Sequence, residues 1–260
     1  MPTPLPPAVS PRQTAPARAP APVPEQVRPG RLLRIAARFG PRAVLGGAAL
    51  FAVAVPFGLL LALVEANWAP LRLLDEGASD SLHGYAVGHP GFVWVLKALS
   101  FGGSTQVYLP LLTITAVVLV VVRRPRLAVF SLVTYAGGGV INPAVKAAVG
   151  RARPVLPDPV SHAGGWSFPS GHAQAAVVTA LVLLAVLLPV LPRPLGRIAI
   201  GGALAVVLGI GFSRIGLGVH YVSDVLAGYA LGAAWVAVSA ACFGIWRLPA
   251  DIAGDIGPGQ

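Results

Sequence analysis

The sequence predicts an all-α membrane protein in which six transmembrane helices form one bundle. The chain of 260 residues is 55% hydrophobic and only 11% charged, whereas soluble domains carry about a quarter charged residues. Six long stretches contain no Asp, Glu, Lys or Arg, and five of them reach the roughly 20 residues that a helical span needs. The remaining stretch, residues 198–213, is slightly short, so we expect its helix to extend beyond it.

These stretches are predicted to be helices because a helix satisfies its own backbone N–H and C=O groups in lipid. A large soluble helical bundle is the alternative, and the hydropathy of the stretches disfavours it. The predicted spans lie at about 44–65, 104–122, 127–148, 171–191, 198–214 and 220–244.

The segments that flank the bundle differ from it in composition. Residues 1–30 are rich in Pro and Ala and lack a hydrophobic period, which predicts a disordered tail. Residues 31–43 alternate apolar residues with arginines, as does an amphipathic helix on an anionic leaflet. We therefore divide the chain into these two segments, a six-span membrane domain at 44–247 and a short C-terminal tail at 248–260.

The basic residues are unevenly distributed between the two sides of the predicted bundle. Seven arginines precede the first span, and further basic residues follow the second, fourth and sixth, so that 13 of the 19 lie on one side. By the positive-inside rule that side is cytoplasmic, together with both termini. The net charge of +10 thus reflects orientation in the cytoplasmic membrane, and we predict no nucleic-acid partner.

The segment at about 66–103 is predicted to be a short extracytoplasmic segment of helix and loop. Its aromatic residues suit the membrane interface. We interpret its five acidic and histidine residues as solvated loop side chains, and a cap that gates substrate entry is the alternative. These residues are Asp75, Glu76, Asp80, His83 and His89.

Three motif blocks lie at ends of the predicted spans, and all of them fall on the extracytoplasmic side. Ionisable residues at membrane depth cost roughly 2.5–3.5 kcal/mol each on insertion scales, so a cluster of them indicates a function. The blocks are Lys146 with Arg153 and Pro154, then PSGH at 169–172, then Ser213 and Arg214 with His220 and Asp224.

The cations of these blocks indicate a site for phosphate. Arginine offers a planar fork of donors that binds two oxygens at once, and lysine adds a compact charge. Lys146, Arg153 and Arg214 supply both kinds of group. A phosphate ester carries up to two negative charges, and the transition state of its transfer spreads them over three equatorial oxygens.

The second block is predicted to open a helix, where unsatisfied N–H groups and the helix dipole favour an anion. The amides of Gly171 and His172 would point at the phosphate, and the Ser170 hydroxyl would add a donor. Gly171 also lacks the Cβ that would hinder close approach.

Two histidines can divide the chemistry between them. His220 and Asp224 are four residues apart, which puts them on one helix face. Asp224 can hold one ring nitrogen protonated and leave the other to attack phosphorus. His172 then serves as the acid for the leaving oxygen and as the base for water. The cations already neutralise the phosphate, so we predict neither metal nor cofactor.

Other polar residues near the blocks allow two interpretations each. Arg151 either touches phosphate or is solvated, Asn142 caps or bridges within the third span, and Ser213 either belongs to the site or packs between helices. Taken singly, Lys146 and Arg214 could also be interfacial anchors that reach towards water.

The three blocks resemble, at every fixed position, the signature of the type 2 phosphatidic acid phosphatase superfamily, which includes lipid phosphate phosphatases and the soluble vanadium haloperoxidases. The signature covers about 80 residues of this chain and the six-span layout extends the similarity. The resemblance implies a helical core with an extracytoplasmic active site and a phosphohistidine at His220. It implies the acid role for His172 and phosphate-binding roles for Lys146, Arg153, Ser170, Gly171 and Arg214.

We therefore expect metal-independent hydrolysis of a phosphomonoester or pyrophosphate on a membrane lipid. The resemblance implies undecaprenyl pyrophosphate, phosphatidate or phosphatidylglycerophosphate as the substrate class. Three alternatives stay open: a lipid phosphotransferase, a vanadate-dependent haloperoxidase, and a non-catalytic lipid or anion transporter that uses the same pocket. The sequence indicates neither the headgroup nor the oligomeric state.

Overall fold

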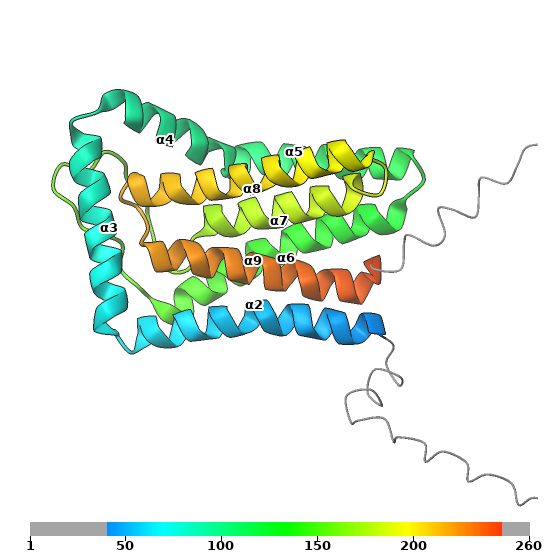
Figure 1. Ribbon diagram of the computed structural model, residues 1–260, viewed down its shortest axis with the longest axis horizontal. Helices are drawn as coiled ribbons and strands as arrows, with labels where there is room; N and C mark the ends of the chain where they lie inside the picture. The colour runs from blue at the N-terminus through cyan, green and yellow to red at the C-terminus, as the bar shows by residue number, and fades with distance from the viewer. Residues whose placement is uncertain (1–40, 246–260) are drawn as a thin grey trace, which may run out of the picture.

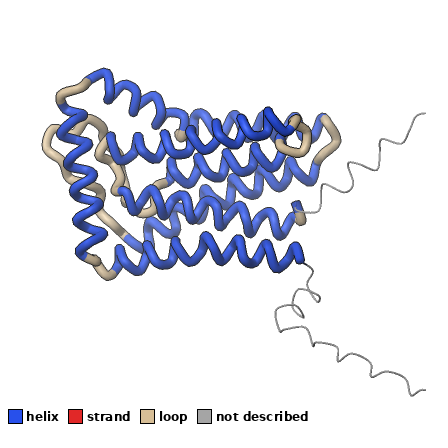
Figure 2. Tube along the Cα trace, viewed as in Figure 1, coloured by secondary structure: helices blue, strands red, loops and turns tan. Residues whose placement is uncertain are grey.

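The computed structural model describes residues 41–245, and these residues form helices and loops with no strand (Figures 1 and 2). All six predicted spans coincide with helices, which confirms the all-α class. The helices are α2 (Pro41–Glu65), α3 (Ala69–Val87), α4 (Pro90–Gly102), α5 (Thr105–Val121), α6 (Pro125–Val149), α7 (Gly171–Leu187), α8 (Arg193–Gly216) and α9 (Val222–Phe243).

The long helices run side by side, and α3 lies across one end of them (Figure 1). Helix α7 packs against α6, α8 and α9, and α2 packs against the outer side of α9. Helix α2 begins, and α9 ends, at the end of the bundle opposite α3 (Figure 1). The motif blocks at the C-termini of α6 and α8 and the N-termini of α7 and α9 therefore meet at the α3 end.

Five segments are long and apolar enough to cross a membrane, and the shorter α7 is also apolar. One of these segments joins α4 to α5 as residues 90–121. Large apolar side chains such as Phe51, Val140 and Ile198 are about 70% exposed, as lipid-facing residues should be. Helix α8 begins at Arg193, with Pro194 in its first turn, so it extends N-terminally beyond the short stretch seen in the sequence.

Two glycines let α9 approach α7 closely enough to join their N-termini. A Cβ at Gly228 would lie 2.5 Å from the Ser170 carbonyl oxygen, and a Cβ at Gly232 would lie 2.9 Å from that of Gln174. The close approach lets the Ser170 N–H donate to the Asp224 carbonyl oxygen at 2.9 Å. Small residues at helix contacts have this effect in membranes, and here they bring two motif blocks together.

The segment at 66–103 consists almost entirely of two helices, α3 and α4. Asp80 and His89 are exposed, as the solvated interpretation predicted. For Asp75 and His83 that interpretation is wrong, because they are 1% and 5% exposed. Their spacing of eight residues, with buried Ser79 between them, places them on the helix face that is turned to the bundle.

Three predicted segments lie wholly or mostly outside the described residues. They are the tail at 1–30, the amphipathic segment at 31–43 and the C-terminal tail at 248–260.

Candidate active site

His220 and Asp224 are oriented towards each other at the α8–α9 junction, and both are almost fully buried. His220 Nδ1 lies 3.4 Å from Asp224 Oδ2. The same carboxylate oxygen accepts from the Tyr221 N–H at 2.9 Å and from the Ser167 hydroxyl. Because Nδ1 faces a carboxylate, we assign the proton to Nδ1, which leaves Nε2 with a free electron pair.

His220 is held neutral by its surroundings. Burial lowers the pKa of His220 from 6.5 to about 4, because it penalises the charged imidazolium. The Asp224 carboxylate raises this pKa and the charges of Arg153 and Arg214 lower it further. The imidazole is therefore neutral near pH 7, as a nucleophile must be.

Arg153 lies on the free side of the His220 ring. Its Nη1 donates to the Val219 carbonyl at 2.6 Å and lies 3.1 Å from His220 Nε2. Its other nitrogens donate to the carbonyls of Gly164 and Gly165 at 2.9 and 3.0 Å. A phosphate bound by this guanidinium would be next to the nitrogen that attacks it.

Lys146 approaches the same loop from the C-terminal end of α6. Its Nζ donates to the carbonyl oxygens of Trp166 and Ser167 at 2.5 and 3.2 Å. Arg153 Nη2 also donates to the Trp166 carbonyl, at 3.2 Å. The two cations thus share an acceptor, which places their positive charges together.

Arg214 closes the site from α8 and is 7% exposed. Its Nη1 donates to the Ser100 hydroxyl of α4, and its carbonyl oxygen accepts from the N–H groups of Val219 and His220, each at 3.2 Å. Within the described residues its Nε has no partner. A buried guanidinium N–H without an acceptor suits an anionic ligand.

His172 lies in the first turn of α7, where the positive charges of Arg214, Arg153 and Lys146 act on it. A cavity of about 350 Å³ between α5, α6 and α7 is lined in part by His172 and Tyr135. The imidazole therefore joins the cationic site to a cavity between the spans.

Ser170 and Gly171 form the start of α7. Ser170 is the N-cap, and its hydroxyl accepts from the Ala173 N–H at 3.5 Å. Ser170 is fully buried. A Cβ at Gly171 would lie 3.3 Å from Asn142 Oδ1, so the absence of a side chain there allows α6 and α7 to pack.

The structure shows the partners of Ser213, Asn142 and Arg151. Ser213 donates to the Ile210 carbonyl at 2.6 Å inside α8, as a packing residue does. Asn142 donates to Gln174 Oε1 at 2.7 Å, so it bridges α6 to α7 rather than residues of one span. Arg151 pairs with two carboxylates, those of Asp75 and Asp224, at 2.8 and 2.7 Å.

Sequence reasoning missed Ser167, Ser223 and Asp75, which supply partners to Asp224 or Arg151. Ser167 and Ser223 lie one to three residues from motif positions, but serine alone carries no signal. Asp75, Ser79 and His83 are spaced four residues apart, and this spacing was the one sequence signal for a buried face of α3. Among residues 41–245 no three His, Cys, Asp or Glu side chains gather as metal ligands would.

Comparisons with known proteins agree with this geometry. The model of the PAP2 superfamily matches residues 127–247, which contain all three blocks. Phosphatidylglycerophosphatase B of Bacillus subtilis (strain 168) is 30% identical over 180 residues, covering 68% of this chain and 85% of the relative.

A solved structure has the same fold. It is the crystal structure described as the first transmembrane PAP2 type phosphatidylglycerolphosphate phosphatase from Bacillus subtilis, with a TM-score of 0.65 and 24% identity. The similarity covers 74% of this chain and 94% of that one. The family match and the relative together show that this chain is a multi-pass membrane phosphatase and belongs to the PAP2 superfamily.

Proposed function

We propose that this protein hydrolyses a phosphomonoester or pyrophosphate on a membrane lipid, through a phosphohistidine on His220. One observation carries the proposal. The two nitrogens of His220 face opposite partners, since Nδ1 faces the Asp224 carboxylate at 3.4 Å and Nε2 faces the Arg153 guanidinium at 3.1 Å. A ring in this position can attack a phosphate that the guanidinium holds.

In the first step the phosphate binds between Lys146, Arg153 and Arg214, and its oxygens replace the loop carbonyls as acceptors. The Nε2 electron pair of His220 forms a bond to phosphorus, and the bond from phosphorus to the lipid oxygen breaks. The bound phosphate offsets the charges of Arg214, Arg153 and Lys146 around His172, so that this imidazole can carry a proton, and His172 gives that proton to the leaving oxygen. The phosphoimidazolium keeps its Nδ1 proton, and Asp224 stabilises its charge.

The second step returns the enzyme to its initial state. Neutral His172 takes a proton from water, and the oxygen of that water forms a bond to phosphorus. The bond from phosphorus to Nε2 breaks, inorganic phosphate leaves, and His172 is again protonated. The cations stabilise the charge that develops in both steps.

The lipid nature of the substrate is supported by the cavity beside His172. Its lining comes from α5, α6 and α7, three of the apolar helices of the bundle, and includes Tyr108 and Tyr135. The name of the Bacillus subtilis relative favours phosphatidylglycerophosphate over phosphatidate and undecaprenyl pyrophosphate. Arg123, Arg124 and Arg193 lie between α5 and α6 and at the start of α8. These elements meet at the end of the bundle opposite α3 (Figure 1), so the positive-inside rule favours an extracytoplasmic site.

The test uses purified full-length protein in detergent with EDTA. We expect release of inorganic phosphate from the wild type without an added acceptor, and none from His220→Ala or His172→Ala. Full activity in either variant would overturn the assigned roles, and phosphate release only with an acceptor would identify a phosphotransferase. Comparing kcat/KM for phosphatidylglycerophosphate, phosphatidate and undecaprenyl pyrophosphate identifies the lipid, and we expect the first to be preferred.

A further inference from the structure

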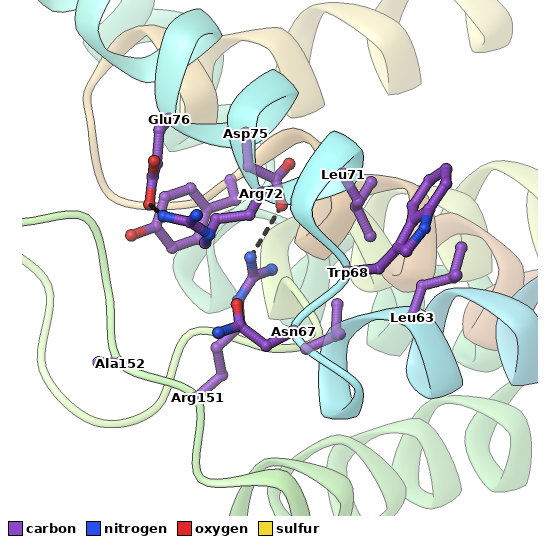
Figure 3. A pocket seen from close by; sticks show the side chains of 11 residues that line it. Leu63, Asn67, Trp68, Leu71, Arg72, Asp75, Glu76, Arg151 and Ala152 are labelled. Atoms are coloured by element: carbon purple, nitrogen blue, oxygen red, sulfur yellow. Dashed lines mark hydrogen bonds and ion pairs between the residues drawn. The ribbon is translucent and has the colours of Figure 1, made fainter.

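A buried carboxylate of α3 faces the start of α9, outside all three motif blocks. Asp75 accepts from the Ser223 N–H at 2.9 Å and from the Ser223 hydroxyl at 2.5 Å. Its Oδ2 also accepts from Arg151 Nη2 at 2.8 Å. Figure 3 shows Asp75 and Arg151 pointing towards each other from α3 and from the loop after α6. A carboxylate that is 1% exposed is costly to bury without such hydrogen-bond partners.

Arg151 extends this contact to the Asp224 carboxylate. Its Nη1 donates to Asp224 Oδ1 and to the Ser223 hydroxyl, each at 2.7 Å. The guanidinium lies 4.3 Å from the centroid of the Tyr221 ring, within cation–π distance. Burial opposes its charge, but Asp224 and Asp75 raise the pKa of Arg151 above its ordinary value. Arg151 is therefore a charged bridge between two carboxylates.

The bridge reaches the oxygen of Asp224 that His220 does not use. Oδ2 accepts from the Tyr221 N–H and faces His220, whereas Oδ1 accepts from Arg151. With both oxygens engaged, the carboxylate plane is fixed. A fixed plane sets the direction in which the His220 ring points, and so the line along which Nε2 meets phosphorus.

We propose that Asp75 and Arg151 are positioning residues: they form a relay from α3 through Asp224 that aims His220 at the phosphorus atom. The proposal rests on the function proposed above for His220. It assigns α3 a part in the reaction, although this helix contributes no residue to the motif blocks. Neither residue touches the substrate, so both should act on the rate of the chemical step rather than on phosphate binding.

The outer side of the relay is accessible to small solutes. A pocket of about 250 Å³ at the α2–α3 elbow is lined by Asp75, Arg151, Tyr221 and Trp68, among others (Figure 3). Replacing Arg151 by alanine would open a space large enough for a free guanidinium ion. Free guanidinium ion could then enter this space and bind between the two carboxylates. Recovery of kcat with guanidinium ion would show that the bridging charge itself acts on Asp224, whereas a role of Arg151 in stability alone predicts no recovery.

The test compares Asp75→Asn and Arg151→Ala with the wild type in detergent. Asp80→Asn is the matched control, because Asp80 is an exposed carboxylate on the same helix. We expect kcat to fall roughly 10- to 100-fold in both relay variants, the loss typical of outer partners that orient an active group. The KM and the inhibition constant of inorganic phosphate should change by less than about threefold, since phosphate binding is preserved.

Guanidinium ion at millimolar concentration should restore part of kcat in Arg151→Ala and none in Asp75→Asn. Unchanged kcat in Asp75→Asn overturns the proposal, as does a parallel loss of inhibition by inorganic phosphate, which would mean that the phosphate pocket has collapsed. If His220→Ala abolishes activity while Asp75→Asn is unaffected, only the relay fails. If His220→Ala remains active, the proposed function itself fails.

Discussion

The two ends of the bundle differ in the burial and pairing of their charged residues. At the α3 end, Asp75, Asp224 and Arg214 are buried, and each has a charged or hydroxyl partner. At the other end, Arg123, Arg124, Arg193 and Arg197 are all exposed, and none of them forms an ion pair with another described residue. Buried charges are costly unless paired and are therefore fixed in position, whereas exposed charges interact weakly with their surroundings. Only the first end can place a charge accurately enough for catalysis.

The largest effect on kcat should follow from replacing Asp224, the buried carboxylate beside His220 at the α3 end, with an uncharged residue. Asp224→Asn removes the charge that faces the His220 Nδ1 proton and breaks the pair with Arg151. We expect kcat to fall about 10⁴-fold, as when the carboxylate of a catalytic triad is replaced by its amide. Phosphate release in detergent measures the change, and thermal unfolding checks that the variant is folded. A loss of tenfold or less would show that Asp224 does not orient the nucleophile.

Arg153→Lys keeps a positive charge at the α3 end and removes the planar fork of donors that positions it. Lysine cannot reproduce the fork that reaches the carbonyls of Val219 and Gly164 and also lies beside His220. We expect kcat/KM to fall about 10²-fold, the loss from removing one donor to the transition state. Wild-type kinetics in this variant would mean that charge alone suffices at this position.

The burial of His220 predicts a dependence of stability on pH. The pKa of His220 is lowered to about 4 from 6.5, so between these pH values the unfolded chain binds a proton that the folded protein does not. Stability should therefore fall as the pH decreases from 6.5 towards 4, by about 1.6 kcal/mol over the first 1.5 units.

Thermal unfolding of the wild type and His220→Gln at pH 6.5 and pH 5 measures this contribution. Glutamine does not titrate, so the variant should lose less stability over the same interval. Equal losses in the two proteins would show that His220 carries its ordinary pKa in the folded state.

The smallest effect is expected at the other end of the bundle. Arg123→Gln with Arg124→Gln removes two exposed charges from the turn between α5 and α6. This turn is at the end of the bundle opposite α3 (Figure 1). We expect kcat/KM to stay within about twofold of the wild type, because exposed charges contribute little to a folded site. A tenfold loss in the purified protein would show that the two ends are coupled.

Much of this architecture could be predicted from the sequence because its signals are local. Charge-free stretches indicated the spans, and His220 and Asp224 are one helical turn apart in the chain. Arg153 precedes the fourth predicted span, and Arg214 ends the fifth. The start of one span and the end of the next lie on the same side of a membrane, so these two cations had to meet there. The contribution of α3 had no such signal, since Asp75 and Arg151 are 76 positions apart. Pairs at that distance depend on how the helices pack, which local patterns do not specify.

The orientation of Arg151, next to a motif residue, also could not be predicted from local sequence patterns. Its neighbour Arg153 was assigned to phosphate from its residue type and spacing, and the structure places it beside His220. Arg151 has the same chemistry two residues earlier, but it points towards α3 and Asp224. In a loop without helix or strand, no period indicates which way a side chain turns.

Phosphorylation of His220 can be observed by trapping the intermediate before water reacts with it. The wild type is mixed with lipid that carries a labelled phosphate, quenched with base within milliseconds, and digested for mass spectrometry. We predict labelled phosphate on the peptide that contains His220, at the imidazole, forming before free phosphate accumulates and absent from His220→Ala. Steady release of labelled phosphate with an unmodified His220 peptide at every time point would contradict it.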